Sequence, residues 1–359
     1  MWRALRRHVP SHGSSHTGLR GSGARLAVSA GRSREPGVDS GVGKPYTYVG
    51  IVGHESGYSR RVLLKAALGG AAGLAFGVPG RLMAQAPAVA ATVRLADDLF
   101  VVTVPGADNV VARTGGGGVV LVDGASAAAS DALLKAVAAL PGGGPVRTLF
   151  NTHWHPQQTG SNEALGKAGV PIIAHENTRL WLTTDVKWPW NGQTFKRLPK
   201  VAQPNKTFYT SATLDSVRYG HLPDCAHTDG DLYVHFEAQN VMAVGDVVSL
   251  QGWPTVDYIT GGWIGGMVGA TQRLLTIANE QTRFVPSRGP VLSYADLKAQ
   301  SSMYATVYER LSTMLNKGRG PSEAVAAKPT KEFDAQMGNP DEFVRRAFES
   351  LWAYLSPDA

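Results

Sequence analysis

Two histidines separated by a single residue, His153 and His155, stand shortly after the apolar segment Val146–Phe150. If that segment is a strand, residues two apart leave it on the same face, so both imidazoles can reach one metal ion. A third histidine, His227, lies in a second loop, and Asp246 closes another apolar run. Three neutral imidazoles and one carboxylate are a ligand set that Zn²⁺ accepts. The spacing therefore indicates a metal site built from these four residues.

The motifs occur in the order found in the metallo-β-lactamase fold superfamily, which the chain resembles from about residue 91 to about residue 297. In that family a His-x-His-x-Asp-His loop is followed by a His before Thr-x-Gly-Asp, by an Asp that closes a strand, and by a last His in a turn. The resemblance implies an α/β fold, a four-layer αββα sandwich, with C-terminal helices after it. It also implies that the first metal site is complete, with Asp246 in the place of the bridging carboxylate.

The second metal site of the family is not retained. Gln157 stands where the family has an Asp, Gln158 where it has a His, and Arg288 where it has its last His. Every ligand exclusive to the second ion has changed, which favours one Zn²⁺ per chain. The permanently charged guanidinium of Arg288 can supply part of the lost positive charge beside Asp246.

A zinc ion held by three imidazoles lowers the pKa of a bound water to roughly 7, so that hydroxide is available for hydrolysis. We therefore expect a hydrolase of an ester, lactone, thioester or amide, with Asp246 and Arg288 as catalytic groups. The expected substrate is a small molecule, and Arg288 would suit an anionic one. Two alternatives stay open: a mononuclear Fe²⁺ oxygenase, as in the persulfide dioxygenases of this superfamily, and a non-catalytic binding protein that has lost its metal.

The first 86 residues differ in composition from the rest of the chain. Residues 1–58 lack periodicity, which predicts a disordered or untranslated leader, and residues 59–86 resemble a twin-arginine signal peptide with Arg60 and Arg61 before a short apolar run. We expect residues 87–297 to form the metallo-β-lactamase-like domain and residues 298–359 a helical extension packed on it. This organisation predicts a periplasmic or secreted protein.

The net charge of +7 comes from the leader, because residues 1–86 hold 12 of the 35 Lys+Arg and 3 of the 28 Asp+Glu. The remainder carries a net charge of −2 and gives no electrostatic reason to expect nucleic-acid binding. The apolar run at residues 66–78 is short for a bilayer span, so we expect no stable membrane anchor. The single cysteine, Cys225, excludes an internal disulfide, and the sequence leaves the oligomeric state open.

A polar, aromatic segment covers residues 183–204, and its Trp188 and Trp190 are candidate substrate contacts. In the superfamily this insertion often covers the active site, although the same aromatics would also serve to pin a long loop to the surface. Elsewhere the pattern predicts an antiparallel meander over residues 93–123 and a helix over residues 126–140 with Ser126 as its N-cap. Two further helices are predicted over residues 294–315 and 340–355.

Overall fold

The computed structural model describes residues 90–355. The predicted leader and signal peptide lie outside these residues. Within them, no helix has the combination of length and hydropathy that a membrane crossing requires.

The first sheet has seven strands, in the order β1-β2-β3-β4-β5-β6-β9. Its first four strands pair antiparallel, as the predicted meander requires, and the remaining three pair parallel. Their bounds are β1 Ala91–Arg94, β2 Leu99–Thr103, β3 Val110–Arg113, β4 Val119–Val122, β5 Val146–Phe150, β6 Ile172–His175 and β9 Lys206–Phe208.

The second sheet has five strands, in the order β10-β11-β12-β13-β14, and all neighbours are antiparallel except the parallel pair β13 and β14. The bounds are β10 Ser211–Leu214, β11 Val217–His221, β12 Leu232–Phe236, β13 Val241–Gly245 and β14 Arg283–Pro286. A separate two-stranded ribbon, β7 Val186–Lys187 and β8 Thr194–Phe195, lies in the insertion.

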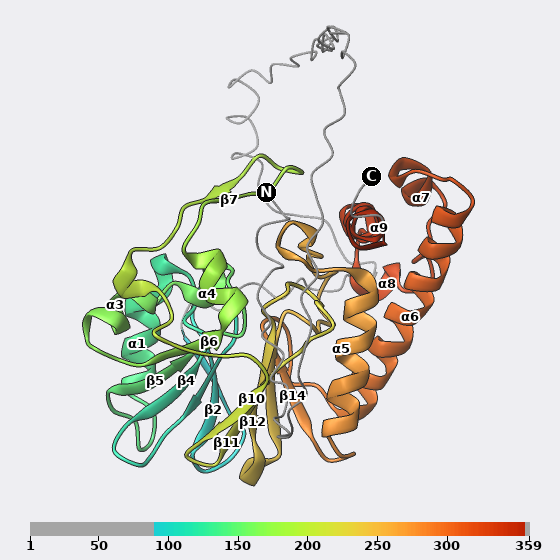
Figure 1. Cartoon of the computed structure of the whole chain (residues 1–359). Helices are drawn as coiled ribbons and strands as arrows, with labels where there is room; N and C mark the ends of the chain where they lie inside the picture. Colours follow the sequence, from blue (N-terminus) through green and yellow to red (C-terminus); the bar gives the residue numbers. More distant parts are fainter. Residues whose placement is uncertain (1–89, 356–359) are drawn as a thin grey trace, which may run out of the picture. The chain divides into compact units, whose positions relative to one another are not determined.

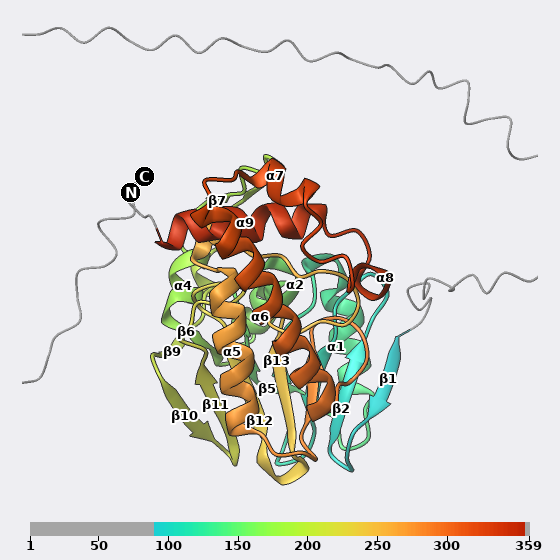
Figure 2. The ribbon, with the colours of Figure 1, turned by 90° about the vertical axis from the view of Figure 1, so that its right-hand side faces the viewer.

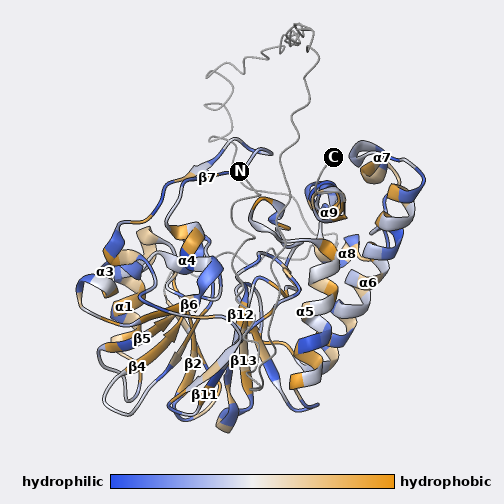
Figure 3. Cartoon of the chain, in the orientation of Figure 1, coloured by the Kyte–Doolittle hydropathy of each residue, from blue (hydrophilic) through white to orange (hydrophobic). Residues whose placement is uncertain are grey.

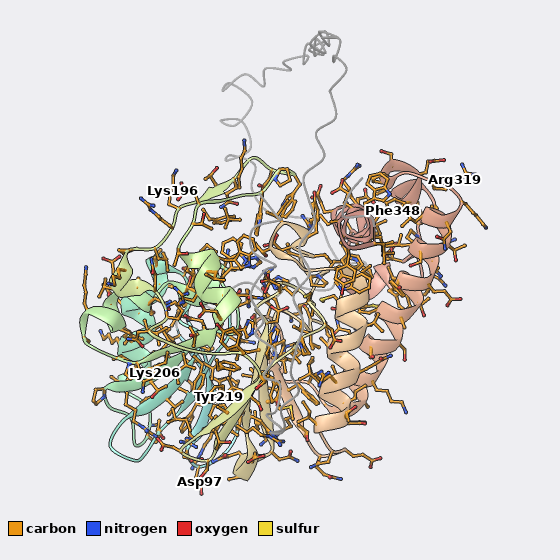
Figure 4. All side chains as sticks on the ribbon, in the orientation of Figure 1. Asp97, Lys196, Lys206, Tyr219, Arg319 and Phe348 are labelled. Carbon is orange, nitrogen blue, oxygen red and sulfur yellow. The ribbon has the colours of Figure 1, made fainter. Side chains whose placement is uncertain are left out.

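Alternation along the strands divides the apolar side chains between two layers of core. In β4, for example, Val120 and Val122 face the second sheet while Val119 and Leu121 face the helices. Tyr219 of β11 packs against Phe150 and Phe208 of the first sheet, which places it between the two sheets (Figure 4). The interior strands are accordingly the most apolar part of the ribbon (Figure 3).

Helices cover both outer faces of the paired sheets, which gives the expected four-layer αββα arrangement (Figure 1). The first sheet carries α1 Ser130–Ala138, α3 Asn162–Lys167 and α4 Glu176–Leu182, with the short α2 Pro156–Thr159 after the histidine loop. The second sheet is covered by α5 Ile264–Ile277 and α6 Tyr294–Asn316, and α9 Asp341–Leu355 crosses them at one end (Figure 2). Two short helices, α7 Pro321–Ala326 and α8 Asp334–Met337, connect α6 to α9.

The predicted helix over residues 126–140 is shorter than expected. A 3₁₀ turn, Ala127–Ala129, comes first, and Ser126 makes no side-chain capping hydrogen bond. The expectation that its hydroxyl caps this helix is therefore wrong, because the backbone carbonyl of Ser126 instead accepts from the Ala129 amide. At the start of α9, by contrast, a side chain does cap the helix: the side-chain oxygen of Asn339 accepts a hydrogen bond from the backbone N–H of Asp341 at 3.0 Å. The expected boundary between residues 297 and 298 falls inside α6.

Candidate metal centre

His153 and His155 lie in the loop between β5 and α2, at the carboxyl end of the strand, and both are buried. The loop is fixed by Asp123, which follows β4 and accepts hydrogen bonds from the backbone N–H and the hydroxyl of Thr152. The same hydroxyl lies 3.1 Å from Nδ1 of His153. Nδ1 is therefore engaged, and Nε2 of His153 is the nitrogen left to face an ion.

His227 is held by a second carboxylate, that of Asp231. One carboxylate oxygen of Asp231 accepts from the backbone N–H groups of His227 and Thr228, and the other lies 3.6 Å from Nδ1 of His227. Burial alone would lower the pKa of His227, but the nearby Asp231 carboxylate outweighs that effect and raises the pKa. Asp231 thus lies outside the cluster and orients the ring of His227. Carboxylates commonly have this role beside a metal-binding imidazole.

Asp246 follows β13 and completes the cluster. Its Oδ2 lies 3.5 Å from Nε2 of His153 and 3.7 Å from Nε2 of His227. One ligand atom from each of His153, His155, His227 and Asp246 lies within 4.8 Å of all the others. The structure therefore brings together all four residues that the sequence predicts as metal ligands.

Buried imidazole nitrogens without hydrogen-bond partners indicate whether a metal ion fits these residues. Nε2 of His153 and Nε2 of His227 are buried and have no hydrogen-bond partner within residues 90–355. Burial, and then the neighbouring His227 and His155, lower the pKa of His153 well below its usual value, so the ring is neutral and its lone pair is available. Unpaired imidazole nitrogens that converge on a carboxylate suit a divalent transition metal. The donor set fits the ion that the sequence predicts.

Asp257 is a functional residue that the sequence did not reveal. It is fully buried, and its Oδ2 lies 3.1 Å from Nε2 of His155 and accepts a hydrogen bond from Thr260. This contact leaves Nδ1 of His155 for an ion and fixes the orientation of the ring. Asp257 lies in a loop 102 positions from His155, with no strand or repeat next to it, so no local pattern marks it.

Two of the three predicted positions of the lost second site, Gln158 and Arg288, lie together, and the third does not. Gln158 is buried and donates to Asp108 at 3.1 Å, while Arg288 Nε lies 3.4 Å from Asp108 and its Nη2 lies 3.9 Å from Asp246. Gln157 is exposed on α2 and takes no part in this group. Asp108, which no motif in the sequence marks, therefore links Gln158 to Arg288.

The charges around the cluster set the state of both acids. Burial would raise the pKa of Asp246, but His227, His153 and Arg288 together lower it to about 2. Burial raises the pKa of Asp108 to about 6, and the nearby negative charge of Asp246 adds to that effect while Arg288 opposes it. Asp246 is thus ionised at neutral pH.

The insertion reaches the cluster through its aromatic residues. The ring of Trp188 lies 5.2 Å from that of His155, edge to face, and 5.0 Å from that of Trp190. Trp190 in turn contacts Tyr258, next to Asp257. Trp188 therefore flanks a candidate ligand, and Trp190 extends the aromatic surface toward the loop of Asp257.

Residues 103–291, more than half of the chain, match the metallo-beta-lactamase superfamily. Among solved structures, the FIM-1 metallo-β-lactamase from Pseudomonas aeruginosa in its mono-zinc form is 16% identical, with a TM-score of 0.50 over 60% of this chain and 95% of that one. The DIM-1 metallo-β-lactamase is 18% identical, with a TM-score of 0.49 over 62% and 99%. The enzyme from Pontibacter korlensis is 20% identical, with a TM-score of 0.48 over 60% and 99%.

The comparison with curated proteins found no match. The superfamily match covers the strands and loops that carry His153, His155, His227 and Asp246, and the αββα layers are those of the similar structures. The chain therefore belongs to the metallo-β-lactamase superfamily.

Proposed function

We propose that this protein is a hydrolase with one zinc ion per chain, held by His153, His155, His227 and Asp246, and that it cleaves an ester, lactone, thioester or amide. The observation that carries the proposal is the pair of buried Nε2 atoms, of His153 and His227, which lie beside the Asp246 carboxylate and have no hydrogen-bond partner in the part of the chain that the structure describes. When bound, such an ion polarises a carbonyl and lowers the pKa of a coordinated water.

The surrounding residues have separate tasks in this proposal. Asp246 stays ionised at neutral pH, so its carboxylate can accept a hydrogen bond from the attacking water and orient it. Arg288 has a half-exposed side chain, and its guanidinium can donate to a substrate carboxylate or to the developing oxyanion. Trp188 and Trp190 offer an aromatic surface beside the cluster for an apolar part of the substrate.

Metal analysis of protein purified without added metal tests the proposal. We expect one equivalent of zinc in the wild-type protein and none in His227→Ala, together with hydrolysis of at least one member of a panel of chromogenic esters, thioesters and lactones. His235→Ala is the control, because His235 is a buried histidine of β12 outside the cluster. One equivalent of iron would support the oxygenase alternative, and a metal-free, inactive wild type would support a binding protein.

We further propose that the protein is exported by the twin-arginine route and acts in the periplasm or outside the cell. The proposal rests on Arg60 and Arg61 before an apolar run and on the Ala-Gln-Ala sequence at residues 84–86. Mass spectrometry of the exported protein should find a mature chain that begins near Pro87. Full-length protein confined to the cytoplasm would contradict the proposal.

A further inference from the structure

A cluster of charged and polar groups lies beside the candidate zinc ligands and is built from four separate segments. Asp108 precedes β3, Gln158 lies on α2, Asp246 follows β13 and Arg288 follows β14. Arg288 bridges two carboxylates, because its Nε lies 3.4 Å from Asp108 and its Nη2 lies 3.9 Å from Asp246. The side chains of the two acids are only 15% and 13% exposed. One guanidinium is thus shared by two largely buried carboxylates.

The neighbouring backbone holds this arrangement in place. Asn109 donates its backbone N–H to the carbonyl of Ser287 at 2.7 Å, and its side-chain amide donates to the carbonyls of Pro286 and Gly289. These three hydrogen bonds tie the turn that carries Arg288 to the loop that carries Asp108. The proximity of Asp108 and Arg288 is therefore imposed by Asn109 and does not depend on the surface ion pair alone.

Gln158 adds a third oxygen ligand to the cluster. The residue is 1% exposed, and its Nε2 donates to Asp108 and to Ser287. Its Oε1 is buried and has no hydrogen-bond partner among the described residues. A buried, unpaired amide oxygen beside two carboxylates is an oxygen-rich donor set of the kind that hard divalent cations prefer.

We propose that Asp108, Asp246 and Gln158 form a second cation locus, and that Arg288 occupies it as a built-in cation in place of a metal ion. Two buried carboxylates repel each other unless a positive charge lies between them, and the guanidinium supplies that charge permanently. Asp108 is not at any position of the superfamily's metal motifs, so this locus differs from the usual second site in its ligands. The inference deepens the proposed one-zinc function and rests on it, because it explains why a single ion would suffice.

Removal of the guanidinium is expected to open the locus to a metal ion. Mn²⁺ is a suitable probe, because oxygen ligands suit it and it stands lowest in the affinity order for the divalent first-row metals, so it should not displace zinc from the imidazoles. Zinc-loaded protein is titrated with Mn²⁺, and free Mn²⁺ is counted by electron paramagnetic resonance. We expect Arg288→Gln to bind one equivalent of Mn²⁺ more than the wild-type protein.

Three variants distinguish this locus from general charge effects. Arg288→Lys retains the positive charge and should bind no additional Mn²⁺. The double variant Arg288→Gln, Asp108→Asn removes a ligand as well as the guanidinium and should lose the additional equivalent. Asp97→Asn is the control, because it removes the carboxylate of an exposed ion pair with Arg94. Asp97 lies at the opposite end of the molecule from Lys196, which belongs to the insertion (Figure 4). This variant should bind as much Mn²⁺ as the wild type.

The proposal is overturned if Arg288→Gln binds no more Mn²⁺ than the wild type, or if the double variant retains the additional equivalent. Circular dichroism checks that each variant is folded, and Arg288→Ala serves as a second opening variant. The test is a difference in Mn²⁺ equivalents between variants, whereas the proposed hydrolase is tested by zinc content and turnover of the wild type. Failure of one is therefore distinguishable from failure of the other.

Discussion

Each candidate zinc-binding imidazole has its other nitrogen close to a protein oxygen. Thr152 lies beside His153, Asp257 beside His155 and Asp231 beside His227. These contacts fix the orientation of each ring before an ion arrives, and partners of this kind commonly contribute to metal affinity. The strongest case is Asp257, because it is the one of the three that brings a buried carboxylate to 3.1 Å from the imidazole.

We expect Asp257→Asn to weaken zinc binding by about 10- to 100-fold, because the substitution removes the negative charge that supports His155 as a ligand. Competition with a chromogenic chelator measures the change. Asp97→Asn, on the exposed surface, is the matched control. Unchanged zinc affinity in Asp257→Asn would mean that this carboxylate serves only the packing of its loop.

Arg288→Ala tests the role of the guanidinium in turnover. With one zinc per chain, we expect kcat/KM for a carboxylate-bearing ester to fall by about 10²-fold, since a charge-assisted hydrogen bond is worth roughly 1.5–3 kcal/mol. The neutral analogue of the same ester should lose far less. Steady-state kinetics on the two esters measure the ratio, and an equal loss on both would show that Arg288 does not select an anionic group.

At the scale of elements, the insertion is held to the rest of the site by aromatic contacts. Trp188 packs against Phe195 of β8 and against His155, and Trp190 lies under the guanidinium of Arg346 from α9. The two-stranded ribbon and the C-terminal helix therefore meet beside the metal cluster. Both lie at the end of the sheets where β5 and β13 terminate (Figure 1).

Trp188→Ala should raise KM about tenfold and leave the zinc content unchanged. The reason is that an aromatic contact contributes about 0.5–1.5 kcal/mol, while no zinc ligand is removed. Steady-state kinetics and elemental analysis on the same preparation measure the two quantities. Trp352→Ala, which removes an exposed tryptophan of α9, should leave KM unchanged. If Trp188→Ala also leaves KM unchanged, the insertion only pins a surface loop.

At the scale of the whole molecule, two histidines join the sheets at the end nearest the site. His175 ends β6 of the first sheet and His221 ends β11 of the second, and their rings stack at 3.6 Å between centroids. Burial, and then the nearby His221, lower the pKa of His175 to about 4. Its Nδ1 accepts from the backbone N–H of Asn177 and caps α4.

This stacked pair predicts a loss of stability in mild acid. Below about pH 6.5 the unfolded chain takes up a proton at His175 that the folded protein accepts only near pH 4, so the free energy of unfolding falls as the pH decreases through that window. Between pH 7 and pH 5, His175 lowers the free energy of unfolding by about 2 kcal/mol. His175→Asn keeps a side-chain oxygen that can cap α4. Between pH 7 and pH 5 its free energy of unfolding should therefore fall by about 2 kcal/mol less than that of the wild type.

Urea unfolding at pH 7 and at pH 5 measures the difference between the wild type and His175→Asn. Titrating groups away from the stacked pair contribute equally to both proteins, so the comparison reports on His175 together with its stacked neighbour His221. The same dependence on pH in both proteins would show that this histidine is not held neutral in the folded state.

The sequence alone was sufficient for the superfamily, the αββα class and the cluster of His153, His155, His227 and Asp246. The superfamily and the fold class follow from motifs that occur in the family order. His153, His155 and Asp246 stand just after apolar strands, and strand periodicity determines which residues share a face, whereas His227 was found only by its motif. The long helices α6 and α9 were predicted because the apolar faces and start signals of a helix are local.

Only the tertiary structure decided which loops meet at the site. Asp257 contacts His155, which is 102 residues away in the sequence, and Asp108 contacts Gln158, which is 50 residues away. No sequence pattern near either acid indicates which residue it contacts. Sheet membership was likewise not predictable from the sequence: strands β9 and β10 are adjacent in the chain yet belong to different sheets. Periodicity identifies the buried face of a strand but not the sheet that it joins, and the partner of a loop carboxylate is determined by packing between distant segments.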